Sequence, residues 1–177
     1  MTVQQLGPAN ATLSVRTKRT GAAAKAGHDL VIAVTAWEGT LDLAETTTME
    51  LRADATSLRV QKGTGGMQAL GDDDKANIHQ TIDDEVLKRE DIRFRSTRVE
   101  QGEGEGALRV EGDLTLAGTT RPIAFDLAIG DDGRISATAV VKQTAWGMKP
   151  YSALFGTLKV VDEVEVVLDA HLPPQSR

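Results

Sequence analysis

The sequence predicts an all-β protein, a single closed antiparallel barrel of eight strands with one helical insertion around residues 72–88. Three observations carry this prediction. Apolar and polar residues alternate along most of the chain, which is the pattern of strands with one dry and one wet face. Turn segments rich in glycine and aspartate separate these runs. Helical spacing is confined to one segment, and 177 residues suit a single domain with its own core.

The N-terminal half contains four alternating runs that predict strands or parts of strands. They lie at 13–15, 30–34, 39–43 and 49–51. A further strand is predicted to begin at Ile92 and Phe94, because these residues alternate with arginines that would face water.

The helical insertion begins at three acidic residues, 72–74, which are favourable at the positive end of a helix dipole. They precede residues spaced by four, which place one apolar stripe along a helix: Ile78, Ile82 and Val86. Thr81 and Asp84 also resemble a capping box, so two short helices are an alternative.

The clearest alternation lies after residue 107. The first run has a dry face of Leu108, Val110, Gly112, Leu114 and Leu116, and later runs cover 123–129, 135–141 and 160–170. Residues 117–122 and 130–133 supply turns, since Gly and Asp accept the positive φ of tight hairpins. Such strands are compatible with a barrel or a sandwich, and the alternation favours a barrel with an apolar inner face.

Two stretches of the C-terminal half resemble the signature of the YceI-like family. Residues 92–97 read IRFRST and residues 112–122 read GDLTLAGTTRP, similar to the "I-x-F-x-S-T" strand and the "G-x-L-T-L-x-G-x-T-x-P" hairpin of that family. The resemblance extends over roughly 10–172, which defines one predicted domain. It implies an extended lipocalin-like barrel whose elongated apolar cavity holds a polyisoprenoid or another long-chain amphiphile.

Composition excludes several classes of function. The absence of cysteine removes disulfide scaffolds, thiol catalysis, iron–sulfur clusters and cysteine-ligated zinc. A net charge of -6 disfavours nucleic-acid binding, and the basic run from Lys88 to Arg98 is interleaved with acids. No run reaches the ~18 apolar residues of a membrane helix, so stable membrane insertion is not expected. Without a signal peptide, the expected compartment is the cytoplasm, or the periplasm or exterior if a leader was removed.

The apolar residues are mostly small. Only six residues are aromatic, and Gly112, Ala137 and Ala139 fall on predicted dry faces, where they would leave room for a ligand. Half of the aromatics lie in 144–156. This segment is interpreted either as a lid, with Lys142 or Lys149 near a polar head group, or as a plug that closes a filled barrel.

The function predicted first is non-enzymatic binding, transport or storage of a long-chain isoprenoid or fatty-acyl amphiphile. The predicted partners are this lipid and, as a possible assembly, a second copy of the chain. No catalytic residue, metal or cofactor is predicted. The predicted ligand-binding residues point inward: Ile32, Val34, Leu114, Leu116, Phe125, Leu127, Ala137, Ala139, Val141, Trp146 and Leu154.

Two alternatives remain open. An enzyme acting on a small apolar substrate inside the barrel would use His28, Lys142 or Tyr151 as acid or base, although His28 and Asp29 would point to opposite faces of a strand. A stress or interaction module with a filled barrel is the other alternative. The spacing of His79 and Asp83 fits two metal ligands on one helix face, but a charged surface helix explains this pair better.

Overall fold

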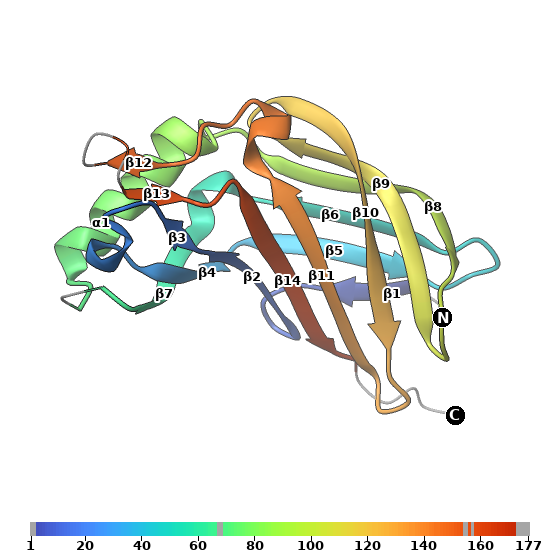
Figure 1. Cartoon of the computed structure of the whole chain (residues 1–177). Coiled ribbons are helices and arrows are strands. Elements are labelled where there is room, and N and C mark those ends of the chain that lie inside the picture. Colours follow the sequence, from blue (N-terminus) through green and yellow to red (C-terminus); the bar gives the residue numbers. More distant parts are fainter. Residues whose placement is uncertain (1–2, 67–68, 154–155, 157, 173–177) are drawn as a thin grey trace.

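The computed structural model describes residues 3–66, 69–153, 156 and 158–172. Its main feature is one strongly curled antiparallel sheet of eleven strands in the order β1-β5-β6-β8-β9-β10-β11-β14-β2-β4-β7 (Figure 1). The strands are β1 (Val3–Leu6), β2 (Ala11–Thr17), β4 (Asp29–Val34), β5 (Trp37–Asp42), β6 (Thr48–Ala53), β7 (Leu58–Thr64), β8 (Ile92–Gln101), β9 (Ala107–Leu116), β10 (Thr119–Ile129), β11 (Arg134–Lys142) and β14 (Glu163–His171).

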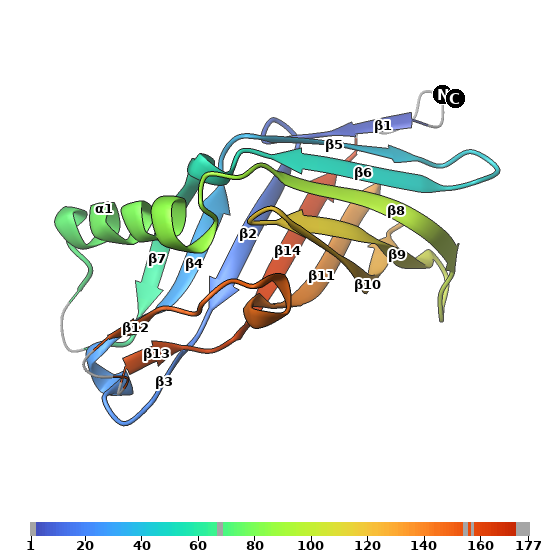
Figure 2. The same cartoon turned by 90° about the horizontal axis from the view of Figure 1, so that it is seen from above.

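Small elements gather at one end of this sheet. A second sheet has the order β12-β13-β3, and its strands are β3 (Arg19–Thr20), β12 (Ser152–Ala153) and β13 (Leu158–Val160). The helical elements are η1 (Ala24–Ala26), η2 (Ala55–Ser57), α1 (Asp72–Thr81), η3 (Ile82–Val86) and η4 (Gln143–Trp146). Figure 2 shows α1 and the small sheet at the same end, on either side of β2 and β4.

The predicted all-β class is confirmed, but the closed eight-stranded barrel is not. The sheet is an open half-barrel, and β1 and β7 are its two edge strands. Two strands of this sheet, β1 and β7, were not predicted, and β7 arises at a corner of one long hairpin. β4 and β5 are separated only by residues 35–36, and β6 and β7 only by 54–57. Backbone hydrogen bonds from Thr35 to Ser57 and from Asp54 to Ala36, both 3.0 Å, continue the pairing through the corner. The chain therefore bends without losing its partner.

Side chains hold this corner as well. The carboxylate of Asp54 accepts hydrogen bonds from the N–H and the hydroxyl of Thr56, at 2.8 and 2.7 Å. These bonds lower the pKa of Asp54, the hydroxyl making the largest contribution. The Ser57 hydroxyl is buried and donates to the carbonyl of Asp54 at 2.7 Å. Local polar contacts thus satisfy backbone groups that the bend would otherwise expose.

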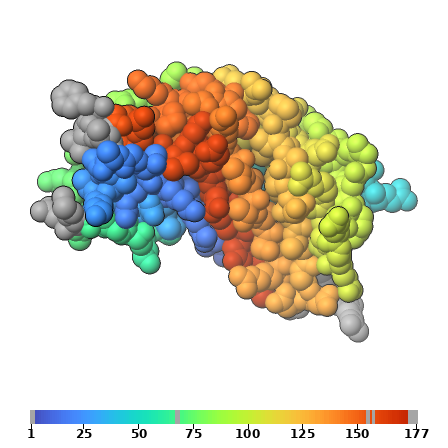
Figure 3. Space-filling view, viewed as in Figure 1, coloured from blue at the N-terminus to red at the C-terminus, as the bar shows by residue number. Residues whose placement is uncertain are grey.

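Segments far apart in the sequence pair with one another inside the sheet. β14 pairs with β2 in register from Glu165 opposite Arg16 to Ala170 opposite Ala11. β3 pairs with β13 in the small sheet. Figure 3 shows the resulting contact between the N-terminal segment (blue) and the C-terminal segment (red) on one face of the molecule.

The helical insertion is continuous and two residues shorter than predicted. α1 passes directly into η3, a π-helical turn in which the Leu87 N–H donates to the carbonyl of Ile82 at 2.9 Å. Thr81 makes no side-chain cap, so the alternative of two capped helices is wrong. Lys88 and Arg89 then adopt positive φ angles of 54° and 56°, a conformation that few non-glycine residues take. This reversal returns the chain to β8.

One end of the curled sheet is packed solid. Its largest fully buried side chains are Leu41, Leu127, Ile135 and Val110. The packed region stops at Phe94 and Phe125, whose ring centroids lie 5.5 Å apart with planes inclined by 54°. Such tilted pairs are a favourable aromatic geometry.

Gly112 makes this aromatic pair possible. It lies opposite Ile123 on β10 and opposite Ser96 on β8. A Cβ at Gly112 would lie 2.6 Å from Cε2 and Cζ of Phe94 and 2.5 Å from the carbonyl oxygen of Arg95. The space that glycine leaves is therefore occupied by a phenyl ring, which corrects the expectation that it leaves room for a ligand.

Gly112→Ala is expected to lower the free energy of unfolding by about 1–3 kcal/mol, because the added methyl group overpacks the contact with Phe94 and the β8 backbone. Chemical denaturation of the purified variant measures this change. Gly7→Ala is the control, since a Cβ there would meet only the carbonyl oxygen of Trp37 at 3.5 Å. Equal stabilities of the two variants would contradict the account of the Gly112 contact.

Candidate functional site

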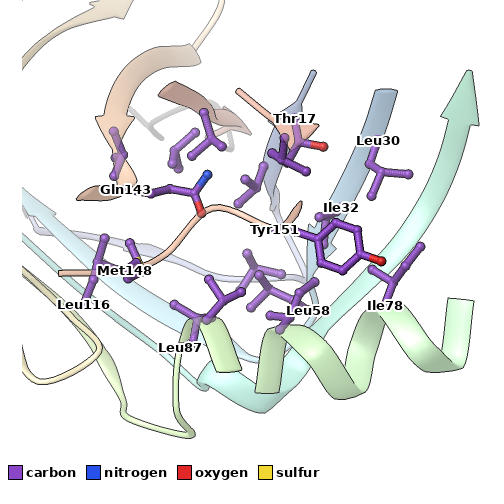
Figure 4. A pocket seen from close by; sticks show the side chains of 18 of the residues that line it. Thr17, Leu30, Ile32, Leu58, Ile78, Leu87, Leu116, Gln143, Met148 and Tyr151 are labelled. Carbon is purple, nitrogen blue, oxygen red and sulfur yellow. The ribbon is translucent and has the colours of Figure 1, made fainter. Parts of the chain in front are cut away.

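A cavity of about 720 Å³ lies beyond the aromatic pair. Its walls are the inner face of the curled sheet, the inward side of α1 and η3, and the segment from η4 to β13 (Figure 4). Binding sites for small molecules are usually roughly 300–1,000 Å³ and mostly apolar. The cavity has both properties, since most of the side chains lining it are aliphatic.

The alternation of each strand explains the apolar wall. Every second residue faces inward, and the inward positions of β2, β4, β11 and β14 are aliphatic with few exceptions. β2 contributes Leu13, Val15 and Thr17, and β4 contributes Leu30, Ile32 and Val34. β11 contributes Ala137, Ala139 and Val141, and β14 contributes Val164, Val166 and Leu168. Ile78, Ile82 and Val86 complete the wall from the helical side, as the predicted apolar stripe requires.

Eight of the residues predicted to bind ligand line this cavity: Ile32, Val34, Leu114, Leu116, Phe125, Ala137, Ala139 and Val141. Leu127 does not, because it lies one inward position beyond Phe125 in the packed end and is 0% exposed. Trp146 is also absent from the wall. Leu154 falls outside the described residues. Contact of any of these residues with a ligand stays a prediction.

Trp146 anchors the segment that follows β11. Its indole Nε1–H donates to the carbonyl oxygen of Leu114 at 2.8 Å, in a buried hydrogen bond. Gly147 has a left-handed φ of 74°, and Met148 then turns back, its N–H donating to the carbonyl of Gln143 at 3.1 Å. The described part of 144–156 therefore has features of both the plug and the lid. Trp146 is buried and bonds to β9, while Met148 and Tyr151 line the cavity.

A carboxylate fixes the start of this segment. Asp162 accepts hydrogen bonds from the N–H of Thr144 at 2.9 Å and from its hydroxyl at 2.6 Å. Burial alone would raise the pKa of Asp162, but these hydrogen bonds and the nearby Lys142 cation bring it below its ordinary value. The ionised carboxylate is thus the form that holds η4 in place.

Polar and charged residues line the outer part of the cavity, away from the packed core. They include Arg19, His28, Asp74 and Lys159. The Arg19 guanidinium donates to the carbonyl of Thr64 at 2.6 Å, and its backbone N–H donates to Asp29 at 2.8 Å. Lys142 and Lys149, which were predicted near a head group, are exposed and do not line the cavity.

Sequence reasoning named His28 only as a candidate acid or base and missed Arg19, Asp74 and Lys159. A signal for the positions of Arg19 and His28 was present in two glycines. Gly65 and Gly66 both have positive φ. A Cβ at Gly65 would clash with the guanidinium of Arg19, and a Cβ at Gly66 would lie 2.5 Å from Nε2 of His28. The paired glycines mark the place where two cationic or polar side chains from distant segments pack on the β7 turn.

The residues proposed for an enzymatic alternative are not gathered in one place. His28 and Tyr151 line the cavity, but Lys142 does not. The Asp29 carboxylate accepts the backbone N–H of Arg19. Among the described residues, no group of three or more His, Asp or Glu side chains is arranged to hold a metal ion.

His79 attaches α1 to the last strand of the sheet. Its Nε2 accepts a hydrogen bond from the backbone N–H of Val60 at 2.9 Å, so this nitrogen is engaged by the protein. Burial lowers the pKa of His79, the cations of Arg59 and Lys75 lower it further, and Asp83 opposes them. The neutral imidazole, which can accept the bond, is therefore favoured.

The basic residues between 88 and 98 are exposed, and three of them pair with acids. Arg89 pairs with Asp84 at 2.8 Å, Arg95 with Glu50 at 3.3 Å, and Arg98 with Glu100. Exposed pairs of this kind contribute little to stability, but they leave no strongly basic stripe along β8.

The fold is a curled antiparallel β-sheet with one packed end and one mostly apolar cavity. The YceI-like domain model matches residues 5–172, so the chain belongs to the YceI-like family. This confirms the resemblance seen in the 92–97 and 112–122 motifs. Among the described residues, no helix has the length and apolar character needed to cross a bilayer.

Solved structures agree on the fold. BcnA of Burkholderia cenocepacia is 14% identical, with a TM-score of 0.63 over 90% of this chain and 94% of that one. The YCEI protein of Campylobacter jejuni is 15% identical, with a TM-score of 0.54 over 82% of this chain and 85% of that one. No curated protein matches the chain in sequence.

The attachment of α1 is expected to depend on pH. Because the folded state lowers the pKa of His79, the stabilisation is complete above its ordinary value of 6.5 and is lost as pH falls through the lowered value. The protection factor of the Val60 amide in hydrogen exchange, corrected for the intrinsic rate, should fall over this window.

Two variants separate titration from packing. His79→Gln keeps a side-chain acceptor that does not titrate, so protection of Val60 should vary little with pH. His79→Leu removes the acceptor, so protection should be low throughout. A Val60 protection factor that is constant from pH 7.5 to 5 in the unmodified protein would rule out this role of His79.

Proposed function

We propose that the protein binds a long-chain isoprenoid or fatty-acyl amphiphile in its cavity, without chemical conversion, for transport or storage. The observation that supports this most directly is the 720 Å³ cavity with its nearly continuous aliphatic wall. Membership of the YceI-like family supports the same kind of ligand, through the resemblance described above.

The energetics favour a chain-like occupant. Each buried methylene contributes about 0.8 kcal/mol, so ten methylenes would contribute on the order of 8 kcal/mol before ordering costs. Apolar cavities of this kind hold water poorly, since a buried water needs about two to four polar partners. An apolar chain therefore gains more from this wall than water does.

The shape and lining of the cavity support one orientation of the ligand. The Phe94–Phe125 pair closes the inner end, and Ala137 and Ala139 keep the wall between it and the outer part free of bulk. The polar and charged residues Arg19, His28, Asp74 and Lys159 lie in the outer part. A chain would place its apolar terminus toward the aromatic pair.

The two alternatives have weaker support. A filled-barrel module would have little use for a cavity of this volume. Catalysis would require reactive side chains brought together, and of the three proposed residues Lys142 is absent from the wall. The possible homodimer and the cellular compartment stay predictions.

The direct test is native mass spectrometry of the protein purified from its own host, followed by organic extraction. The expected result is an added mass that disappears on extraction and is recovered as a lipid. Protein at its bare mass, together with no displacement of a dansyl-labelled fatty acid by added isoprenoid alcohols or fatty acids, would contradict the proposal.

Ala139→Trp should weaken binding of the dansyl-labelled fatty acid at least tenfold, because the indole would occupy the middle of the cavity. Val140→Trp is the matched control, since Val140 is the next residue of β11 and is 60% exposed on the outer face. Fluorescence titration measures both variants, and thermal unfolding verifies that both are folded. Equal affinities would place the probe elsewhere on the protein.

A further inference from the structure

The apolar wall contains one buried amide. Of the described polar residues that line the cavity, Gln143 is the one less than a tenth exposed, at 7%. Its apolar neighbours on the wall, Leu116, Val141 and Met148, are buried as well. Figure 4 shows the Gln143 side chain pointing into the cavity, on the side of Met148 and Leu116.

The backbone holds Gln143 firmly in this position. Its N–H donates to the carbonyl of Asp162 at 3.0 Å, and its carbonyl accepts the N–H of Met148 at 3.1 Å. The Asp162 carboxylate fixes the next residue, Thr144. The side chain is thus presented by a rigid turn, and its direction is not a consequence of a loose loop.

The hydrogen-bonding capacity of this amide is largely unused within the described residues. Nε2 donates to the carbonyl of Val161 over a long 3.4 Å, beyond the usual range of about 2.7–3.2 Å. No hydrogen bond to Oε1 is formed by the described part of the chain. Oε1 is not one of the fully enclosed side-chain atoms of the described residues, so it can be reached from the cavity that Gln143 lines. The aliphatic neighbours offer a water at this position few further partners.

We propose that Gln143 Oε1 recognises a hydrogen-bond donor on the ligand, so that the preferred ligand is a neutral long-chain alcohol or amide. This inference rests on the proposed function and specifies its substrate class. A hydroxyl or amide N–H can donate to Oε1, whereas an ether or a carboxylate presents only acceptors there. Few polar groups in an apolar pocket set orientation and selectivity.

The test is a competition assay in which unlabelled compounds displace the dansyl-labelled fatty acid. The compounds are hexadecan-1-ol, its methyl ether and hexadecane, which share a chain and differ in the donor. The unmodified protein should bind the alcohol roughly 3- to 10-fold more tightly than the ether, as expected for one hydrogen bond.

Gln143→Met replaces the amide with an apolar side chain of similar length. It should reduce this preference to near unity while leaving the affinity for hexadecane unchanged or higher. Met148→Leu is the control, because it alters the same part of the wall without touching the amide, and it should keep the preference for the alcohol.

The outcomes separate this inference from the proposed function. Displacement by all three compounds with equal affinity, unchanged in Gln143→Met, would overturn the role of Gln143 and leave apolar chain binding intact. Displacement by none of them would count against both. Loss of the preference in Met148→Leu as well as in Gln143→Met would assign it to wall packing and overturn the hydrogen bond.

Discussion

The contact between Gly112 and the ring of Phe94 lies at the boundary between the packed core of this protein and its cavity. Because position 112 has no side chain, the ring lies against β9 and meets Phe125 from the adjacent strand. On one side of this pair, buried side chains such as Leu41, Val110 and Leu127 form a core; on the other side the same sheet lines a cavity. One curled sheet thus provides a stable core at one end and a binding volume at the other, and neither end requires a separate domain.

The helical cover of the cavity, α1 with η3, is held more by polar contacts than by burial. None of the described residues of α1 and η3 is fully buried, and one side-chain acceptor, His79 Nε2, ties α1 to the backbone of β7. η4 differs, because it buries Gln143 and Trp146 and is fixed by Asp162 and by the indole of Trp146. Apolar residues therefore form the wall, while directional bonds decide where the covering segments lie. Such an arrangement is suited to admitting a ligand, since weakly buried segments open at low cost.

The face of a strand on which each residue lies can be predicted well from the sequence. Whether that residue belongs to the packed core or to the cavity wall, and how the strands are connected, is predicted poorly. Alternation correctly identifies Ala137, Ala139 and Leu114 as inward residues, because the pleat alone decides the face. It cannot separate Phe125 from Leu127, which share a face, since the boundary between core and cavity is set by Phe94, a residue from another strand. The corner at 35–36 does leave a trace: buried positions change phase between Val34 and Trp37. The contacts of Arg19 and His28 with the glycine turn are long-range, so only the paired glycines hint at them.

The helix α1, which lies beside the edge strand β7, also affects association between molecules. β7 is the last strand of the sheet, and an uncovered edge strand presents unpaired backbone groups that can pair with another chain. α1 lies beside this edge, and the bond from Val60 to His79 uses one of its outward N–H groups. The helix therefore shields a potential site of strand-to-strand aggregation in addition to forming one wall of the cavity. Any change that detaches it exposes an apolar interior and a sheet edge together, which couples access to the cavity with the solubility of the protein.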